Sequence, residues 1–185
     1  MSNRTKRDLE DALKTMLLQK PLDKITIRDL TDVAGISRMA FYYHFQDIYD
    51  LVEWVCIEDA RLALDGKKTA DTWQDGLAHV FEAVRENKPF VLNAYHSLDR
   101  ERMERFLLGL TADLIRGVVD EKSQGINVSD DDKAFIARFY TYSFVGLMLD
   151  WIGRGMTDDY HEIVKKICLI MHAAVDHAIA HFADR

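Results

Sequence analysis

The chain has 185 residues, of which 48% are hydrophobic and 30% are charged, a balance typical of a packed globular protein and unlike that of a disordered one. This length holds one large domain or two small ones that share a core, and it excludes an array of independent modules. With only two prolines and nine glycines, and with Leu, Ala, Met and charged residues in plenty, the composition excludes an all-β fold and predicts an all-α one.

The N-terminal segment is predicted to form an amphipathic helix over residues 5–20. Apolar residues recur in it at spacings of three and four, which places them on one stripe of a helix. They are Leu9, Ala12, Leu13, Met16 and Leu17. Pro21 ends this helix, because proline lacks an N–H group and its ring clashes with the preceding turn.

Two short helices joined by a tight turn come next. Thr26, with an acidic residue three positions later, resembles a capping box and predicts a helix over residues 27–34. Gly35 can adopt the left-handed conformation that ends a helix, and Ser37 can cap the next one, over residues 38–45. A helix-turn-helix arrangement of this kind lets the second helix lie in the major groove of DNA while the first braces it.

The helix over residues 38–45 is predicted to have one apolar face. Phe41 and Phe45 lie four residues apart and point to the core. We assign Tyr43 mostly to packing within the structure. The residues left facing outward are Arg38, Met39, Tyr42 and His44.

A fourth helix is predicted to start after Asp47, which caps it, and to end near Asp65–Gly66, where Lys67 opens a polar connection. We divide the chain after residue 50. Residues 1–50 then form the helix-turn-helix domain, and residues 51–185 form a helical body.

Five further helices are predicted in the body, over residues 72–86, 89–97, 100–121, 130–154 and 158–183. The last two are longer than an average helix and apolar around much of their circumference. Their apolar surface is more than one small subunit can bury. We therefore predict a homodimer whose subunits meet through these last two helices.

Charge and hydropathy point to a protein of the cytoplasm. The longest run without a charged residue, residues 139–149, is far shorter than the roughly 20 apolar residues that cross a bilayer. The first residues are polar, and we expect no secretory segment.

Cys56 and Cys168 are isolated, so we expect reduced thiols and no disulfide or zinc site. The net charge of −7 is unevenly distributed along the chain. Residues 1–46 hold eight Lys and Arg against six Asp and Glu, so this segment is mildly basic and the rest of the chain is acidic.

Residues 26–51, TIRDLTDVAGISRMAFYYHFQDIYDL, closely resemble the N-terminal domain of the TetR/AcrR family of bacterial transcriptional regulators. The turn AGIS at residues 34–37 and the run FYYHF at residues 41–45 carry the likeness, which covers residues 5 to 55. The resemblance implies a nine-helix, all-α homodimer that binds double-stranded DNA at a pseudo-palindromic operator. It further implies a divergent C-terminal domain that binds an effector and dimerises.

The resemblance also implies roles for individual residues. Arg28 would reach a guanine edge, while Arg38 and Met39 would meet base edges at the start of the recognition helix. The positions that match phosphate contacts in the family are Thr26, Ser37, Tyr42 and His44. On its position alone, His44 fits a cap of the helix end equally well. The family usually has a phosphate-binding lysine where this chain has Ile48.

A second resemblance concerns the body. The segments VRENKPF at residues 84–90 and WIGRGM at residues 151–156 are similar to the C-terminal region of a TetR branch that includes regulators of dihydroxyacetone-kinase operons. Some members of that branch are thought to engage a partner protein, so the resemblance leaves a small molecule and a protein open as the effector. The residues we predict to contact it are Arg85, Tyr95, His96, Tyr142 and Trp151.

Enzymatic and metal chemistry are not expected. No Ser-His-Asp order, nucleotide-binding glycine loop or paired-carboxylate motif stands out, so we predict neither a catalytic residue nor a cofactor. His177 and His181 have the spacing of a helical metal site but no evident third ligand, which favours a solvated or interface face. The alternative hypotheses are a helical protein-interaction module, or a metal-binding helical protein, that does not bind DNA.

Overall fold

The computed structural model describes residues 2–64, 69, 71–98 and 100–183, and the side chains of these except at positions 2, 102, 106, 110, 172 and 173. This part of the chain is all-α and contains no strand, which confirms the predicted fold class. Its elements are α1 (Ser2–Leu17), the 3-10 helix η1 (Leu22–Lys24), α2 (Ile27–Ala34), α3 (Arg38–His44), α4 (Ile48–Ala63), α5 (Trp73–Glu86), α6 (Lys88–Ser97), α7 (Arg100–Lys122), α8 (Asp130–Gly153) and α9 (Tyr160–Ala183).

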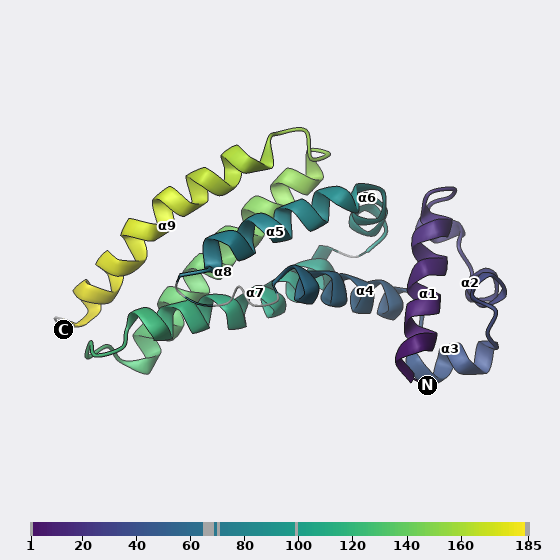
Figure 1. Cartoon of the computed structure of the whole chain (residues 1–185), viewed down its shortest axis with the longest axis horizontal. Helices are drawn as coiled ribbons and strands as arrows, with labels where there is room; N and C mark the ends of the chain where they lie inside the picture. The colour runs from purple at the N-terminus through teal and green to yellow at the C-terminus, as the bar shows by residue number, and fades with distance from the viewer. Residues whose placement is uncertain (1, 65–68, 70, 99, 184–185) are drawn as a thin grey trace.

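The helices form a small lobe joined to an elongated body. Helices α1, α2 and α3 make the lobe at one end, and α4 leads from it into the body, where α5, α7, α8 and α9 run lengthwise (Figure 1). The N-terminus lies on the lobe and the C-terminus at the far end of the body. No helix within the described residues is both long and apolar enough to cross a membrane.

The helix caps predicted at Thr26 and Asp47 are present in the structure. The hydroxyl of Thr26 accepts a hydrogen bond from the Asp29 N–H at 3.1 Å, and the Asp29 carboxylate accepts one from the Thr26 N–H at 3.0 Å, which completes a capping box. The Asp47 side chain caps α4 by accepting the N–H three residues ahead, and Ser129 does the same for α8. Local capping chemistry therefore sets where these helices begin.

The Asp29 cap predicts a pH dependence of stability. Two hydrogen bonds to the Asp29 carboxylate lower its pKa from 3.8 to about 2. The bond from the Thr26 N–H has the larger effect, and the bond from the Lys20 ammonium, at 3.0 Å, comes second. A lowered pKa stabilises the fold above the unfolded-state value, and this contribution is lost as the pH falls through the folded-state value. Asp29→Ala should therefore lower the urea midpoint near neutral pH, and its difference from the unmodified chain should shrink between pH 3.8 and about 2.

Asp32→Ala is the matched control, because Asp32 is an exposed carboxylate of the same helix that makes no capping bond. Equal losses in both variants, or an Asp29→Ala difference that stays constant across this pH range, would contradict the capping argument.

The segment after α1 differs most from the sequence prediction. Helix α1 ends at Leu17 and not at residue 20, because the Gln19 and Lys20 N–H groups both turn back to the carbonyl of Met16. The 3-10 helix η1 that follows was not predicted; its Leu22 side chain is buried. The predicted end of the fourth helix near Asp65–Gly66 lies outside the described residues.

Two buried clusters hold the helices together. The first, within the body, is built mainly by α5, α7, α8 and α9, with Phe81 and Trp151 almost wholly buried at its centre. The second lies under the lobe, and it also takes in Phe90 and Ala94 of α6 and Leu149 of α8. The lobe is therefore packed on the body through a shared core.

Candidate nucleic-acid interface and effector cavity

The turn between α2 and α3 fixes how the second helix leaves the first. Gly35 has a φ of 67°, in the left-handed region that glycine adopts without strain. The N–H of Ile36 donates to the carbonyl of Thr31 at 3.0 Å, which closes the end of α2. Ser37 then caps α3 by accepting the N–H of Ala40 at 3.1 Å. The turn is thus held on one side by a backbone hydrogen bond and on the other by the side-chain cap of Ser37.

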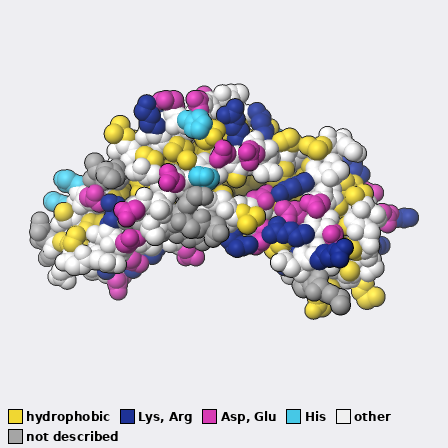
Figure 2. Space-filling view, viewed as in Figure 1, with side chains coloured by type: hydrophobic (Ala, Val, Ile, Leu, Met, Phe, Trp, Pro, Cys, Tyr) yellow, Lys and Arg dark blue, Asp and Glu magenta, His cyan; other side chains and the backbone are white. Residues whose placement is uncertain are grey.

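Helix α3 is anchored on one face and open on the other. Phe41 and Phe45 are buried, with exposed fractions of 0% and 3%, as predicted. On the open face, Met39 is 80% exposed and Tyr42 51%. Two buried aromatic side chains, four positions apart, therefore anchor this two-turn helix and leave its other side chains facing outward. Hydrophobic side chains project from the lower edge of the lobe in the same region (Figure 2).

Tyr43 does not lie where we assigned it. Its side chain is 81% exposed and contacts the ring of His44 edge-on, with 4.9 Å between the centroids. The reason is helical geometry, since a residue two positions from Phe41 and two from Phe45 lies on the side of the helix opposite to both. The assignment of Tyr43 to packing was wrong, and this ring is part of the open face.

The predicted base-reading residues are all exposed. Arg28, in the first turn of α2, contacts only Asp32 among the ion pairs of the described residues, at 3.7 Å, with 81% of its side chain exposed. Such an exposed and long ion pair contributes little and leaves the guanidinium free to turn toward a ligand. Arg38 and Met39 open α3 and are likewise exposed.

The predicted phosphate-contacting residues flank the same two helices. Thr26 and Ser37 are exposed N-cap residues whose oxygens accept backbone N–H bonds, so each hydroxyl hydrogen remains available for a phosphate. Tyr42 contacts Phe41 edge-on at 5.6 Å. His44 is half-buried in the last turn of α3, a place compatible with both roles considered for it.

Ile48 occupies the first position of α4. Its side chain packs against the core of the lobe. An apolar residue therefore strengthens the packing where the family usually has a lysine for a phosphate.

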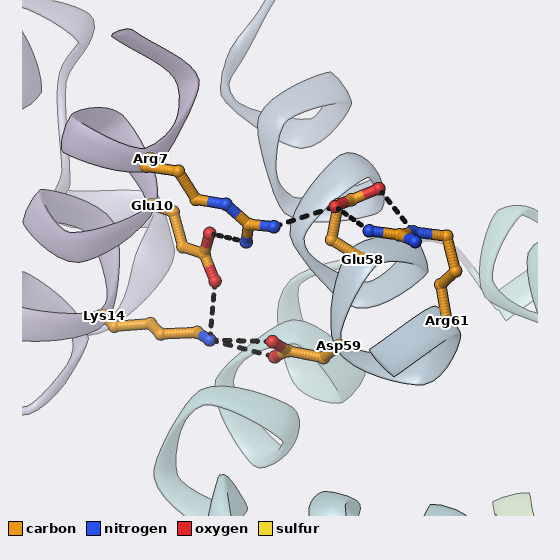
Figure 3. A network of polar contacts seen from close by, with 6 residues as sticks. All are labelled: Arg7, Glu10, Lys14, Glu58, Asp59 and Arg61. Carbon is orange, nitrogen blue, oxygen red and sulfur yellow. Dashed lines mark hydrogen bonds and ion pairs between the residues drawn. The ribbon is translucent and has the colours of Figure 1, made fainter. Parts of the chain in front are cut away.

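A network of ion pairs joins α1 of the lobe to α4 (Figure 3). Arg7 of α1 pairs with Glu10 at 2.6 Å and with Glu58 of α4 at 2.8 Å. Lys14 of α1 pairs with Glu10 and with Asp59 of α4, each at 2.9 Å. The Glu10 side chain is only 7% exposed, and its two cationic partners compensate the burial of its charge. Interleaved basic and acidic side chains mark this junction on the surface (Figure 2).

Burial and pairing compete at the Lys14–Asp59 contact. Burial alone would lower the pKa of Lys14, but the hydrogen bonds that its ammonium donates to two carboxylates outweigh burial and raise that pKa. Among the ion pairs of the described residues, Asp59 pairs with Lys14, and burial raises the pKa of its carboxyl group. The Lys14 charge is therefore held more firmly than the Asp59 charge.

A cavity of about 120 Å³ lies in the body beside this network. Its walls come from α4, α5, α6, α7 and α8, and most of its lining is apolar. Asp59 lines it from α4, close to Cys56, whose pKa burial raises to about 12. The same helix supplies Leu51 and Val55 to the core under the lobe. One helix thus contacts both the cavity and the lobe.

Trp151 and Tyr95, two predicted effector-contacting residues, are packed near the end of α8. Trp151 is 1% exposed and its Nε1 donates to the carbonyl of Asp158 at 3.1 Å, which holds the connection to α9. The Tyr95 hydroxyl lies against Gly153, where a Cβ would approach it to 2.6 Å. Neither side chain lines the cavity.

The other predicted effector-contacting residues lie on the outside. Arg85 is exposed, with its guanidinium 5.5 Å from the ring centre of Tyr160. His96 and Tyr142 are also exposed, and neither they nor Arg85 line the cavity. The structure therefore does not bring the five predicted residues together. Most of the cavity residues are apolar side chains drawn from five helices, and no sequence motif marks them.

Large apolar side chains are exposed along α8 and α9. Leu169 and Ile170 of α9 are 77% and 66% exposed. Those of α8 are Phe135, Phe139, Tyr142 and Leu147. Large apolar side chains exposed on two long helices make these helices a candidate site of association.

Helix α9 carries the histidine pair whose spacing suits a helical metal site. The rings of His177 and His181 are stacked with centroids 6.2 Å apart. Among the described residues, no group of three or more His, Cys, Asp or Glu side chains could hold a metal ion.

Comparisons with known families match most of the chain. The family described as "Transcriptional regulator C-terminal region" matches residues 71–173, more than half of the chain. The family "Bacterial regulatory proteins, tetR family" matches residues 10–55, which include the helix-turn-helix.

Individual proteins agree with these matches. The HTH-type dhaKLM operon transcriptional activator DhaS of Lactococcus lactis is 25% identical over 164 residues, which cover 86% of this chain and 87% of that protein. The solved structure of a dihydroxyacetone kinase operon activator DhaS has a TM-score of 0.74 at 22% identity, covering 92% of this chain and 96% of the other. A TetR transcriptional regulator from Rhodococcus sp. RHA1 has a TM-score of 0.62 at 16% identity, covering 93% and 98%.

Proposed function

Because this chain belongs to the TetR family of transcriptional regulators, we propose that it binds a pseudo-palindromic DNA operator as a homodimer and responds to an effector. The regulators it resembles are not enzymes. The observation that carries the proposal is the capped, outward-facing α3 held on Phe41 and Phe45. We assign DNA binding to residues 1–50, and effector binding and dimerisation to residues 51–185.

The DNA contacts follow from the exposed groups of α2 and α3. Arg28 and Arg38 are the donors that can bond to O6 and N7 of guanine, and Met39 offers an apolar contact to a thymine methyl group. The groups proposed to hold phosphates are Thr26, Ser37, Tyr42 and His44. Outside residues 1–46, sixteen Lys and Arg face twenty-five Asp and Glu, so the body repels DNA and favours approach through the lobe.

Dimerisation is proposed through the exposed apolar side chains of α8 and α9. It would place two copies of α3 about 34–36 Å apart, the spacing of successive major grooves on one face of DNA. A ligand in the body changes DNA affinity only if it prefers a conformation with another spacing. Helix α4 is the proposed link, because it lines the cavity and is tied to α1 by the ion-pair network.

Selection of bound DNA from a random pool tests this function. We expect the full chain to enrich a two-fold symmetric motif. Arg28→Ala should relax the preference at one base of each half-site, a loss of about 1–3 kcal/mol in discrimination. Tyr42→Phe should weaken binding to all sequences alike, because a phosphate contact carries no base information.

Arg105→Ala is the matched control for Arg28→Ala. Arg105 is an exposed arginine of α7 in a pair with Glu101 at 2.8 Å, and its replacement should leave both the motif and the affinity unchanged. The proposal fails if no motif is enriched at low salt, or if the two arginine variants behave alike.

A further inference from the structure

The lining of the cavity restricts the chemistry of what enters it. Apolar side chains from α4 to α8 make up most of its wall, including Leu77, Phe90, Phe144 and Met148. Its volume of about 120 Å³ is close to that of an apolar cavity that binds benzene, roughly 150 Å³. A ligand with an aromatic or short aliphatic body therefore fits, whereas a polyol would lose hydrogen bonds to water without replacing them.

The polar groups on the wall mostly accept hydrogen bonds. The Thr111 hydroxyl already donates to the carbonyl of Leu107 at 2.7 Å, and Asn87 donates through Nδ2 to the carbonyl of Ala83 at 2.9 Å. Two carboxylates, those of Glu53 and Asp59, also line the cavity, and no described lysine or arginine does. The wall is rich in acceptors and poor in available donors.

Asp59 is the carboxylate that connects the cavity to the lobe. Both of its oxygens accept from the Lys14 ammonium, at 3.0 and 2.9 Å (Figure 3). A carboxylate has about four acceptor sites, so one ammonium does not exhaust its capacity. The Lys14 ammonium also lies 5.9 Å from the ring centre of Phe90, another residue of the cavity wall. A cation that reached Asp59 from the cavity would thus meet the same carboxylate as Lys14.

We propose that the cavity binds a small apolar cation, with its body among the apolar side chains and its ammonium group at Asp59. This inference rests on the proposed effector function and names the ligand class of that site. An anionic ligand such as a carboxylate or phosphate meets like charge at Asp59 and finds no lysine or arginine on the described wall.

The same contact gives the ligand a route to the lobe. A second cation at Asp59 competes with Lys14 and weakens the tie between α4 and α1. By linkage, weakening that tie should in turn make the ligand bind more tightly.

Binding of matched probes to the full chain, without DNA, tests the ligand class. Benzylamine, benzyl alcohol and benzoate share one apolar body and differ in the head group. In titration calorimetry we expect benzylamine to bind at least about tenfold more tightly than benzoate, with the alcohol between them, as each tenfold step corresponds to about 1.4 kcal/mol.

Three variants locate the binding. Asp59→Asn should remove the preference for the amine over the alcohol, whereas Glu58→Gln, which changes the neighbouring carboxylate of the same network outside the cavity wall, should keep it. Ala83→Leu, which enlarges a side chain on the wall, should weaken binding of the amine and the alcohol alike. Circular dichroism checks that each variant is folded. If the Asp59→Asn variant does not fold, Ala83→Leu still tests whether the probes bind in the cavity.

The inference is overturned if benzoate binds as tightly as benzylamine, or if benzylamine binds equally well to the unmodified chain and to a folded Asp59→Asn or Ala83→Leu variant. Tighter binding of dihydroxyacetone than of benzylamine would also overturn it. Because DNA selection is done without ligand, a failure of operator binding and a failure of ligand binding are read separately.

Discussion

Replacing Phe41 with alanine is expected to lower the free energy of unfolding by about 3–5 kcal/mol. The ring is fully buried and contacts the rings of Tyr42 and Phe45 with centroids 5.6 and 5.8 Å apart. Its loss leaves a cavity at the centre of the core that anchors α3, so operator binding should fall with stability. Urea unfolding followed by circular dichroism measures the loss.

Tyr43→Ala is the matched control for Phe41→Ala. It removes an aromatic ring from the same helix, but from a side chain that is 81% exposed. Its effect on the free energy of unfolding should stay within about 0.5 kcal/mol. Equal losses in the two variants would show that α3 is not anchored as described.

Introducing two carboxylates on α9, as Leu169→Asp with Ile170→Asp, is expected to convert the proposed dimer into monomers. Burying these charges against the apolar surface of a second subunit is costly, because no cationic partner compensates them there. Operator affinity should then fall roughly 10²–10⁴-fold, the gain that two linked binding sites provide over one. Light scattering after gel filtration and a DNA titration measure the two effects.

Leu18→Asp is the control for the dimer variant. Leu18 is a leucine of similar exposure, 71%, that lies in the lobe outside α8 and α9. Its replacement should leave the molecular mass in solution unchanged. A dimeric double variant of α9, or an unmodified chain that is monomeric at working concentrations, would refute the assignment of the interface.

Features set by neighbouring residues were predictable from the sequence. The Thr26 capping box, the left-handed Gly35 and the Ser37 cap each depend on contacts within a few positions, so the helix-turn-helix and its boundaries follow from local chemistry. The anchor pair Phe41 and Phe45 follows from helical spacing in the same way.

Features that depend on distant contacts were not predictable in this way. The ion pair of Lys14 with Asp59 joins residues 45 positions apart, and the cavity beside it is assembled from five helices. Trp151 illustrates the difficulty, because an aromatic residue with one polar atom suits a ligand site and a buried core equally well. Only the packing shows that its Nε1 is taken by the Asp158 carbonyl.

The shared core under the lobe limits how such a regulator can be recombined. Phe90 and Ala94 of α6 and Leu149 of α8 pack against the same side chains that hold α1 and α3, and Asn93 donates to the Leu17 carbonyl at 3.4 Å. A lobe grafted from a relative would pack against a body surface whose side chains fit a different lobe. New operator specificity is therefore easier to obtain by changing the outward side chains of α2 and α3 than by exchanging whole segments.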